Sequence, residues 1–348
     1  MGGYYLFTNS KCRDFRVEEA SPSACSNVLI IDTTIIPTVT VLITTKDRKD
    51  ELKDAIESSL TLIGDVEILV IDDGSTDGTY EFVTEHYPSV RIIRYEENLG
   101  LIEQRNNGIR LARADYVITI DDDAVFTSPN TALRVIEAFD ADPQAGALAI
   151  PYIDVLYDDQ KVLQVAPDAR THVMSAYVGT AHADRKDLFL QLGGYRDFYY
   201  RQGEEGDYCT RMLGRGYYVK VVDSPVIKHM ESPKRVRSLN MYYEMRNNIL
   251  YAWFNVPFVF LILHLLGTIC VTLKKHIGLG CGFSSTKGIW DGLACAMTSQ
   301  FKERSPVALN DYLAFRFLRK RGVVPLDQFI EKYELNYTKV DSINETTQ

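Results

Sequence analysis

Three adjacent carboxylates, Asp121-Asp122-Asp123, directly follow the apolar run Tyr116–Ile120. Such a run is typical of a buried strand, so the acidic triplet lies at a strand end. Adjacent carboxylates repel one another and resist dehydration, and a cation that neutralises them favours their burial. Asp121 and Asp123 have the Asp-x-Asp spacing of a pair that can hold a divalent metal against a diphosphate group. A solvated acidic turn is the alternative interpretation.

A second acidic pair, Asp72-Asp73, ends the apolar run Val66–Ile71 and is followed by Gly74. Glycine allows a sharp turn there, and Ser75–Asp77 can cap the helix that follows. A carboxylate at this strand end can accept hydrogen bonds from a base imide or a ribose hydroxyl. An Asp-rich turn that only caps the next helix is the competing interpretation.

Charged residues also stand at two predicted helix starts. Arg105 lies in the first turns of the helix predicted at Leu101–Ala112, where its planar fork can bind phosphate oxygens. An ordinary surface arginine gives the same pattern. Glu205 lies in an acidic run that enters another helix, where it can act as a general base toward a hydroxyl, or only complement the helix dipole. Asp207 has Arg211 four residues further on, which predicts an ion pair.

Strands and helices must position these groups, and from Pro37 onward the pattern alternates between them. The apolar periodicity predicts strands at Val39–Ile43, Val66–Ile71, Val90–Arg94 and Tyr116–Ile120, with helices at Asp47–Leu60, Thr79–His86 and Leu101–Ala112. This alternation predicts an α/β fold with a mostly parallel sheet flanked by helices. Ligands bind beyond the carboxyl ends of such strands, where the sequence places its polar clusters.

The C-terminal part is more apolar. Residues 145–233 mix short strands with Gly- and Tyr-rich loops, and the window Phe254–Leu273 is long enough to cross a bilayer as a helix. Pro257 and His264 interrupt this window, and the charges that flank it fix no orientation. Three interpretations remain: an interfacial helix, a buried helix or helix pair, and a true membrane span.

Composition sets further bounds. The net charge of −9 over 348 residues argues against a nucleic-acid partner, because phosphate neutralisation needs a surplus of Lys and Arg. The six cysteines form no CxxC pair, which is typical of a reducing cytoplasm. The N-terminus has no basic and apolar leader, so no signal peptide is expected, and residues 1–36 are predicted to be an N-terminal extension.

The order of the motifs resembles family 2 glycosyltransferases, which are nucleotide-sugar-dependent inverting enzymes of the GT-A fold. The motifs are TTKDR, VIDDGSTDGT, ENLGLIEQRNNGI, ITIDDDAVF and LGGYRDFYYRQGEEGDYCTRM, followed by His229 and YYEMRNN. The resemblance covers about residues 37–255. Arg246-Asn247 before an apolar helix looks most like the rhamnosyltransferase-type branch that builds bacterial surface polysaccharides.

The resemblance implies a role for each matching position. It implies that a UDP-, dTDP- or GDP-sugar donor contacts residues at the strand ends: Thr45, Asp72, Asp73, Arg105, Asp121 and Asp122. It implies that Mg²⁺ or Mn²⁺ is held by Asp121, Asp123 and His229, although a lone histidine is more often structural. Glu205 stands where the family usually has the Asp of its catalytic Glu-Asp motif, so the base would have a longer reach.

The resemblance also implies an organisation and a setting. We expect a GT-A catalytic domain at 37–235 and a C-terminal helical region at 236–348, in a cytoplasmic protein or one at the inner face of the cell membrane. The acceptor is expected to be a saccharide or a lipid-linked group, with peripheral membrane contact.

Two rival classes remain. A Rossmann dehydrogenase would need G-x-G-x-x-G after the first strand, where this chain has Thr44–Asp47. A catalytically degenerate GT-A protein that acts as a membrane-associated assembly factor is the alternative outside the enzymes.

Overall fold

The computed structural model describes residues 36–230, 237–298, 301 and 304–333. All of them belong to one compact unit, which spans Ile36–Gln348. The extension predicted for residues 1–36 lies outside the described residues, apart from Ile36.

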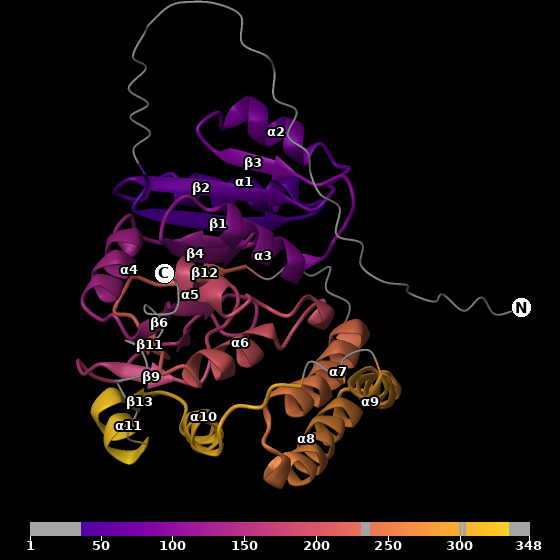
Figure 1. Cartoon of the computed structure of the whole chain (residues 1–348). Coiled ribbons are helices and arrows are strands. Elements are labelled where there is room, and N and C mark those ends of the chain that lie inside the picture. The colour runs from indigo at the N-terminus through magenta and orange to yellow at the C-terminus, as the bar shows by residue number, and fades with distance from the viewer. Residues whose placement is uncertain (1–35, 231–236, 299–300, 302–303, 334–348) are drawn as a thin grey trace, which may run out of the picture. The chain divides into compact units, whose positions relative to one another are not determined.

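Strands and helices alternate along the first part of this unit. The elements are β1 (Val39–Thr45), α1 (Lys49–Ser59), β2 (Val66–Asp72), α2 (Thr79–His86), β3 (Arg91–Arg94), α3 (Leu101–Leu111) and β4 (Tyr116–Asp121). The strands run parallel in the order β4-β1-β2-β3, and helices lie on both faces of the sheet (Figure 1). Each predicted element is present to within two residues at each end.

The sequence explains why this part packs as it does. All seven residues of β1 are buried, as expected for a central strand covered on both faces. The face of α1 predicted to be apolar is the buried one: Leu52, Ala55, Ile56 and Ser59. In the parallel register Thr44 lies opposite Asp121 and Thr45 lies opposite Asp72, so the polar clusters meet at one edge of the sheet.

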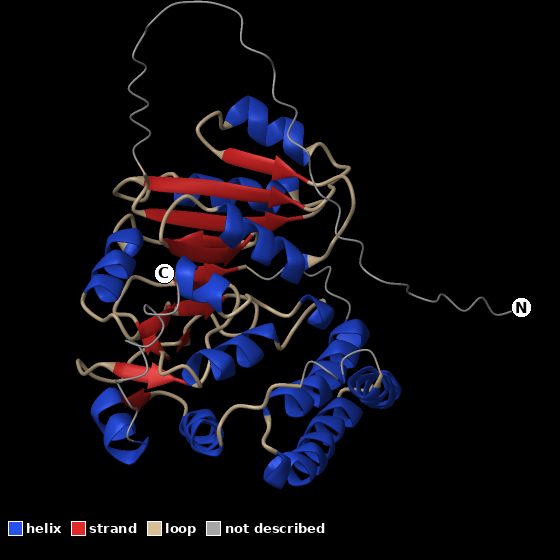
Figure 2. Cartoon of the chain, in the orientation of Figure 1, coloured by secondary structure: helices blue, strands red, loops and turns tan. Residues whose placement is uncertain are grey.

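The following elements are shorter and complete two sheets. They are β5 (Ala124–Phe126), α4 (Thr131–Asp140), β6 (Ala145–Ala149), β7 (Tyr152–Asp154), β8 (Val162–Leu163), β9 (His172–Met174), β10 (Ala181–Arg185), α5 (Lys186–Gln191), the 3-10 turn η1 (Asp197–Tyr199), α6 (Glu204–Leu213), β11 (Tyr218–Val221) and β12 (Ile227–His229). In the described residues the main sheet has the order β13-β9-β11-β6-β10-β4-β1-β2-β3, in which β13 (Val324–Pro325) comes from the C-terminal part of the chain. Because β10 runs antiparallel to both β4 and β6, the parallel half continues into a mixed sheet (Figure 2).

A small second sheet has the order β5-β12-β7-β8. Strand β5 begins immediately after the acidic triplet, and β12 pairs with it so that His229 lies opposite Ala124. On its other side β12 runs parallel to β7, which places His229 opposite Asp154. This sheet therefore brings a histidine and a further carboxylate to the end of β4.

The C-terminal part is mainly helical. It contains α7 (Arg237–Asn255), α8 (Phe258–Gly278), α9 (Gly282–Met297), α10 (Leu309–Arg321), β13 (Val324–Pro325) and α11 (Leu326–Tyr333). The apolar window Phe254–Leu273 is not one helix, because Pro257 separates α7 from α8. Proline lacks an N–H and fixes its own φ, so it ends one helix and begins the next.

Helix α8 is long and apolar enough to cross a membrane, yet only 11% of its most apolar window is buried in the protein. A plain buried helix is therefore the wrong interpretation, and the interfacial and spanning interpretations remain. Strand β13 pairs with β9, so the chain returns from this helical region to the main sheet. The division of the chain at 235/236 stays a prediction.

Candidate active site

A cavity of about 520 Å³ lies at the carboxyl ends of β1 and β4. Most of the residues predicted from the sequence line it: Thr45, Asp73, Arg105, Asp121, Asp122, Glu205 and His229. Asp72 and Asp123 are not among its lining residues, although both are buried beside it. Residues far apart in the sequence thus meet where an α/β sheet places its ligands.

Asp121, Asp123 and His229 form a compact group of metal-ligating side chains. Their ligand atoms all lie within 4.8 Å of one another. The Nε2 atom of His229 lies 3.2 Å from Oδ1 of Asp123 and 3.8 Å from Oδ2 of Asp121. The backbone N–H of Met230 donates to the carbonyl of Asp123, which fixes β12 against the acidic triplet.

The donor set of this group fits a divalent metal. Two carboxylates and one imidazole at metal–ligand distances of about 2.0–2.2 Å would lie about as far apart as these atoms do. Asp154 lies 3.6 Å from Nδ1 of His229, on the side of the ring away from the triplet. Such an outer carboxylate orients an imidazole so that its other nitrogen is available to a metal. These residues can therefore hold Mg²⁺ or Mn²⁺.

The middle residue of the triplet is held by the protein. Asp122 accepts a hydrogen bond of 2.8 Å from Oγ1 of Thr45 and one of 2.8 Å from Nη1 of Arg48. Arg48 also contacts Asp123, at 3.2 Å. Burial raises the pKa of the Asp122 carboxyl to about 7, although the charge of Arg48 opposes this shift. The hydrogen bond between Thr45 and Asp122 thus stabilises the strand end beside Asp121 and Asp123.

Arg105 is not a surface arginine. Its side chain is 3% exposed, and its guanidinium lies 2.6 Å from Asp121 and 3.3 Å from Glu204. Burial alone would lower the pKa of Arg105, but the charges of these two carboxylates raise it above the ordinary value. Gly179 makes this approach possible, because a Cβ there would lie 2.6 Å from Nη1 of Arg105 and 2.8 Å from Oε1 of Glu205.

The two carboxylates after β2 have different surroundings. Asp72 is fully buried and accepts a hydrogen bond from the backbone N–H of Ser75, so it closes the turn into α2. Asp73 lines the cavity and accepts hydrogen bonds from the N–H groups of Leu99 and Gly100 and from the Gln104 amide. The turn interpretation therefore fits Asp72, and Asp73 is the member of the pair that faces the cavity.

Three carboxylates lie in the first turn of α6, and their surroundings separate them. Glu205 is half-buried and lines the cavity. Burial and the charge of Glu205 raise the pKa of Glu204 to about 8, although Arg105 opposes the shift. Asp207 is fully buried and paired with Arg211 at 2.9 Å, as the spacing predicted, and it also binds Arg196. Of the three, Glu204 and Asp207 are buried in ion pairs, whereas Glu205 is half-buried and lines the cavity.

Comparisons with known proteins agree with this geometry. Residues 40–190 match the family model for glycosyl transferase family 2. The chain is 35% identical over 137 residues to the succinoglycan biosynthesis protein ExoO of Rhizobium meliloti, a match that covers 38% of each chain. It is 30% identical over 113 residues to a poly-beta-1,6-N-acetyl-D-glucosamine synthase of Staphylococcus aureus, which covers 32% of this chain and 27% of that protein. The chain thus spans well under half the length of these two relatives.

Solved structures with the same fold cover nearly the whole chain. S. aureus TarS 1-349, crystallised in complex with UDP-GlcNAc, has a TM-score of 0.55 and 15% identity, over 88% of this chain and 91% of that one. The mannosyltransferase PcManGT from Pyrobaculum calidifontis, in complex with GDP-Man and Mn2+, has a TM-score of 0.51 and 18% identity, over 89% and 87%. The fold of this chain is therefore GT-A-like, as the motifs predicted.

Sequence reasoning missed several residues that shape the site. Arg48 belongs to the TTKDR motif directly after β1, and this position could have indicated that it lies at the site. Asp154 lies in a three-residue strand, and Gly179 lies between two strands, and neither gives a pattern of its own. Asn240 of α7 lines the cavity although about 120 residues separate it from the acidic triplet. Only the folded chain brings these residues together.

Proposed function

We propose that this chain is an inverting glycosyltransferase that moves a sugar from a nucleoside diphosphate sugar to a hydroxyl acceptor, in bacterial polysaccharide or glycoconjugate synthesis. The observation that carries this proposal is the meeting of the Asp121–Asp123–His229 group and Glu205 around one cavity. A group that binds a diphosphate beside a group that can take a proton is what such a transfer needs.

The donor end of the site would bind the nucleotide. Asp121, Asp123 and His229 would hold the divalent metal, which supplies positive charge to the diphosphate as the glycosidic bond breaks. Arg105 lies beside Asp121 and adds a fixed cation at the same end of the cavity. Asp73, held by the start of α3, would face the nucleoside.

The acceptor end would carry out the proton transfer. Inversion requires a single in-line displacement, in which the acceptor oxygen attacks C1 and the nucleoside diphosphate leaves from the opposite face. An alcohol is a weak nucleophile at neutral pH, so a carboxylate must take its proton as the new bond forms. Glu205 would accept this proton, because it lines the cavity and is not held in the core as Asp207 is.

The relatives support a role in polysaccharide synthesis, since the names of two of them refer to succinoglycan and to poly-N-acetylglucosamine. We place the chain in the rhamnosyltransferase-type branch, a finer proposal that rests on Arg246-Asn247 before the apolar helix α8. For the nucleotide we retain UDP, dTDP and GDP.

Binding and turnover of donors test this proposal. Thermal shift of the full chain with UDP-, dTDP- and GDP-sugars, each with and without Mn²⁺, should show stabilisation by one nucleotide class that depends on the metal. Slow hydrolysis of the same donor should follow. Binding without hydrolysis or transfer to any acceptor would favour the degenerate assembly factor, and absence of binding by all donors would contradict the proposal.

We also propose that the protein lies at the inner face of the cell membrane through α8 and α9. Their exposed side chains include large apolar ones, namely Phe258, Val259, Ile262, Leu263, Leu266, Val271, Phe283 and Trp290. Lys274 and Lys287 are exposed on the same two helices, and lysines beside an apolar face complement anionic lipid. A helix that lies in the membrane surface explains exposed apolar side chains better than free solvent does.

Vesicle flotation tests this surface. The full chain should float with vesicles that contain phosphatidylglycerol, and the double variant Ile262→Glu/Leu266→Glu should not. Leu156→Glu, at an exposed leucine outside these helices, is the matched control and should float like the wild type. If the wild type instead stays with the soluble fraction as a dimer that the double variant dissociates, a second copy covers this face and the membrane proposal fails.

A further inference from the structure

The loop that precedes the catalytic helix α6 has an unusual backbone. Tyr200 and Gln202 have φ values of +64° and +66°, and Gly203 follows with +87°. Bulky residues other than glycine are strained in this region, at a cost on the order of 1–3 kcal/mol each. Such strain persists only where surrounding contacts fix the backbone, and it concentrates at binding sites. The loop ends directly before Glu204 and Glu205.

Helix α7 supplies the contacts that fix this loop. The side-chain amide of Asn247 is buried, and its Nδ2 atom lies 3.0, 2.7 and 2.7 Å from the carbonyl oxygens of Tyr199, Arg201 and Gln202. Two protons are thus shared among three carbonyl groups. Arg246 donates to the carbonyl of Phe198, at 2.9 Å, and to the Asn247 side-chain oxygen, at 2.8 Å. The loop is held in its strained form by residues of a helix that is distant in sequence.

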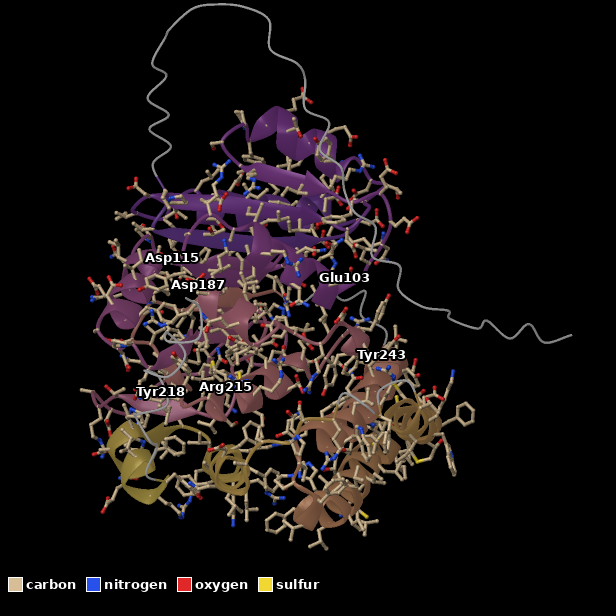
Figure 3. All side chains as sticks on the ribbon, viewed as in Figure 1. Glu103, Asp115, Asp187, Arg215, Tyr218 and Tyr243 are labelled. Carbon is tan, nitrogen blue, oxygen red and sulfur yellow. The ribbon has the colours of Figure 1, made fainter. Side chains whose placement is uncertain are left out.

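The fixed loop presents an aromatic ring to the cavity. Tyr200 lines the cavity, is 44% exposed, and stacks on Tyr243 with ring centroids 5.4 Å apart. Tyr243 lies near the N-terminal end of α7 (Figure 3). The start of α3 limits the other side of the ring, because a Cβ at Gly100 would lie 3.0 Å from Cε2 of Tyr200. The ring therefore has one defined position beside open space.

Two side-chain oxygens of residues that line the cavity have no partner among the described residues. The side-chain oxygens of Gln202 and Asn240 are buried and accept no hydrogen bond in the described part of the chain, and both residues line the cavity. Buried polar atoms are nearly always satisfied, so these two amide oxygens can accept a hydrogen bond from a ligand in the cavity. A hydroxyl group can both donate and accept, so it satisfies such an amide in either orientation.

We propose that Tyr200, Gln202 and Asn240 form the acceptor subsite and that its ligand is a pyranose ring. The C–H groups of the sugar would lie against the part of the Tyr200 ring that is exposed to the cavity, and its hydroxyl groups would donate to the two amide oxygens. A lipid chain offers no hydroxyl to these oxygens, and a phosphate would bring further acceptors to them. The inference rests on the proposed glycosyltransferase function and makes a saccharide the immediate acceptor.

Saturation-transfer NMR with simple sugars tests the subsite. The full chain, with UDP and Mn²⁺ present, is mixed with methyl β-glycosides of glucose, galactose and N-acetylglucosamine. At least one glycoside should receive saturation through its ring C–H protons, and Tyr200→Ala should reduce this signal at least about fivefold. Tyr200→Phe keeps the aromatic face and should retain the signal. Alanine carries the same positive-φ restriction as tyrosine, so the variant tests the ring and not the backbone.

Tyr157→Ala is the matched control, because Tyr157 is 76% exposed and does not line the cavity. Gln202→Ala should raise the acceptor KM with little change in the affinity for the nucleotide. The inference is wrong if no glycoside binds while the nucleotide does, or if Tyr200→Ala binds the glycosides as the wild type does. If no nucleoside diphosphate binds with Mn²⁺, the proposed function itself fails, so the two failures are distinguishable.

Discussion

On one side of the cavity, Asp121 ends the strand β4 and Asp123 lies two residues further on. The interior of β4 is buried, and β1 beside it is buried along its whole length. On the α7 side, Tyr200 and Gln202 lie in a short loop with a strained backbone that a distant helix holds in place. The first region takes its position from regular hydrogen-bonded strands. The second takes its position from a few side-chain contacts across about 45 residues of sequence.

The two regions also differ in how their polar groups are satisfied. The carboxylates of the acidic triplet lie beside Arg48, Arg105 and His229, so each of them has a basic side chain as a neighbour in the protein. The amide oxygens of Gln202 and Asn240 have no partner among the described residues. A charged end built on regular strands suits a donor shared by many enzymes, and a neutral end built on a loop suits an acceptor that differs between them.

The largest effect is expected from the charged end. Asp123→Ala should abolish measurable transfer, because it removes one of three groups that would hold the metal. Charge stabilisation by a metal is worth several kcal/mol, and about 5.5 kcal/mol corresponds to about ten-thousandfold in rate. Mn²⁺ binding, measured by electron paramagnetic resonance, should weaken in parallel.

Asp159→Ala is the control for this variant, because Asp159 is exposed and lies outside the cavity. Its Mn²⁺ affinity and its rate should equal those of the wild type. Full activity of Asp123→Ala in the presence of EDTA would show that the acidic triplet is only a braced turn.

The next effect is expected where the two regions meet, at Glu205. Glu205→Gln should lower turnover by about a hundred- to ten-thousandfold, the usual contribution of a general base, and leave donor affinity nearly unchanged. Glu205→Asp should keep part of the rate, because it restores the commoner carboxylate at a shorter reach. Glu85→Gln, on the exposed surface of α2, is the matched control. Loss of donor binding in Glu205→Gln, or wild-type turnover, would show that Glu205 is not the general base.

The comparison explains which parts the sequence could predict. The elements from Val39 to Asp121 were predictable because each repeats a local apolar period and ends in a polar cluster. The ion pair between Asp207 and Arg211 followed from helical spacing alone. The burial of Arg105 could not be predicted in this way, because it depends on Gly179 and Glu204, which lie 74 and 99 residues away in the sequence.

The α7 side was hidden for the same reason. A positive φ at Tyr200 breaks the local preference of tyrosine, and contacts from Arg246 and Asn247 of α7 hold the loop in this form. The sequence shows that Pro257 interrupts the apolar window, but only the folded chain shows that α7 ends and α8 begins there.

A smaller effect is expected when the link between α7 and the loop is removed. Asn247→Ala leaves three carbonyl groups without their shared donor, which should lower the free energy of unfolding by about 1–3 kcal/mol. It should raise the acceptor KM by about tenfold, since about 1.4 kcal/mol corresponds to a factor of ten. The donor dissociation constant should stay within about twofold.

Asn130→Ala is the matched control, because Asn130 is exposed and its side chain makes no cap hydrogen bond to α4. Equal losses of donor and acceptor affinity in Asn247→Ala would mean that α7 stabilises the whole cavity and that the two regions are not separately held.

The smallest effect concerns pH and the carboxylate beside the base. In the folded protein the pKa of Glu204 is raised to about 8 by burial and by the charge of Glu205, whereas an unfolded glutamate has an ordinary pKa near 4.3. Between these values the folded state binds more protons than the unfolded state, so the free energy of unfolding should fall as the pH rises through this window.

Glu204→Gln keeps an oxygen that can accept a hydrogen bond from Arg105, but its side chain cannot ionise. Its stability relative to the wild type, measured by urea denaturation of the full chain, should therefore increase from pH 5 to pH 9. Each pKa unit of difference is worth about 1.4 kcal/mol, so a gain of that order is measurable. Glu85→Gln, at an exposed site, should show no such trend. Parallel profiles for Glu204→Gln and the wild type would mean that Arg105 keeps Glu204 ionised throughout. The carboxylate at the start of α6 would then be charged and paired with Arg105, as Asp121 of the acidic triplet is.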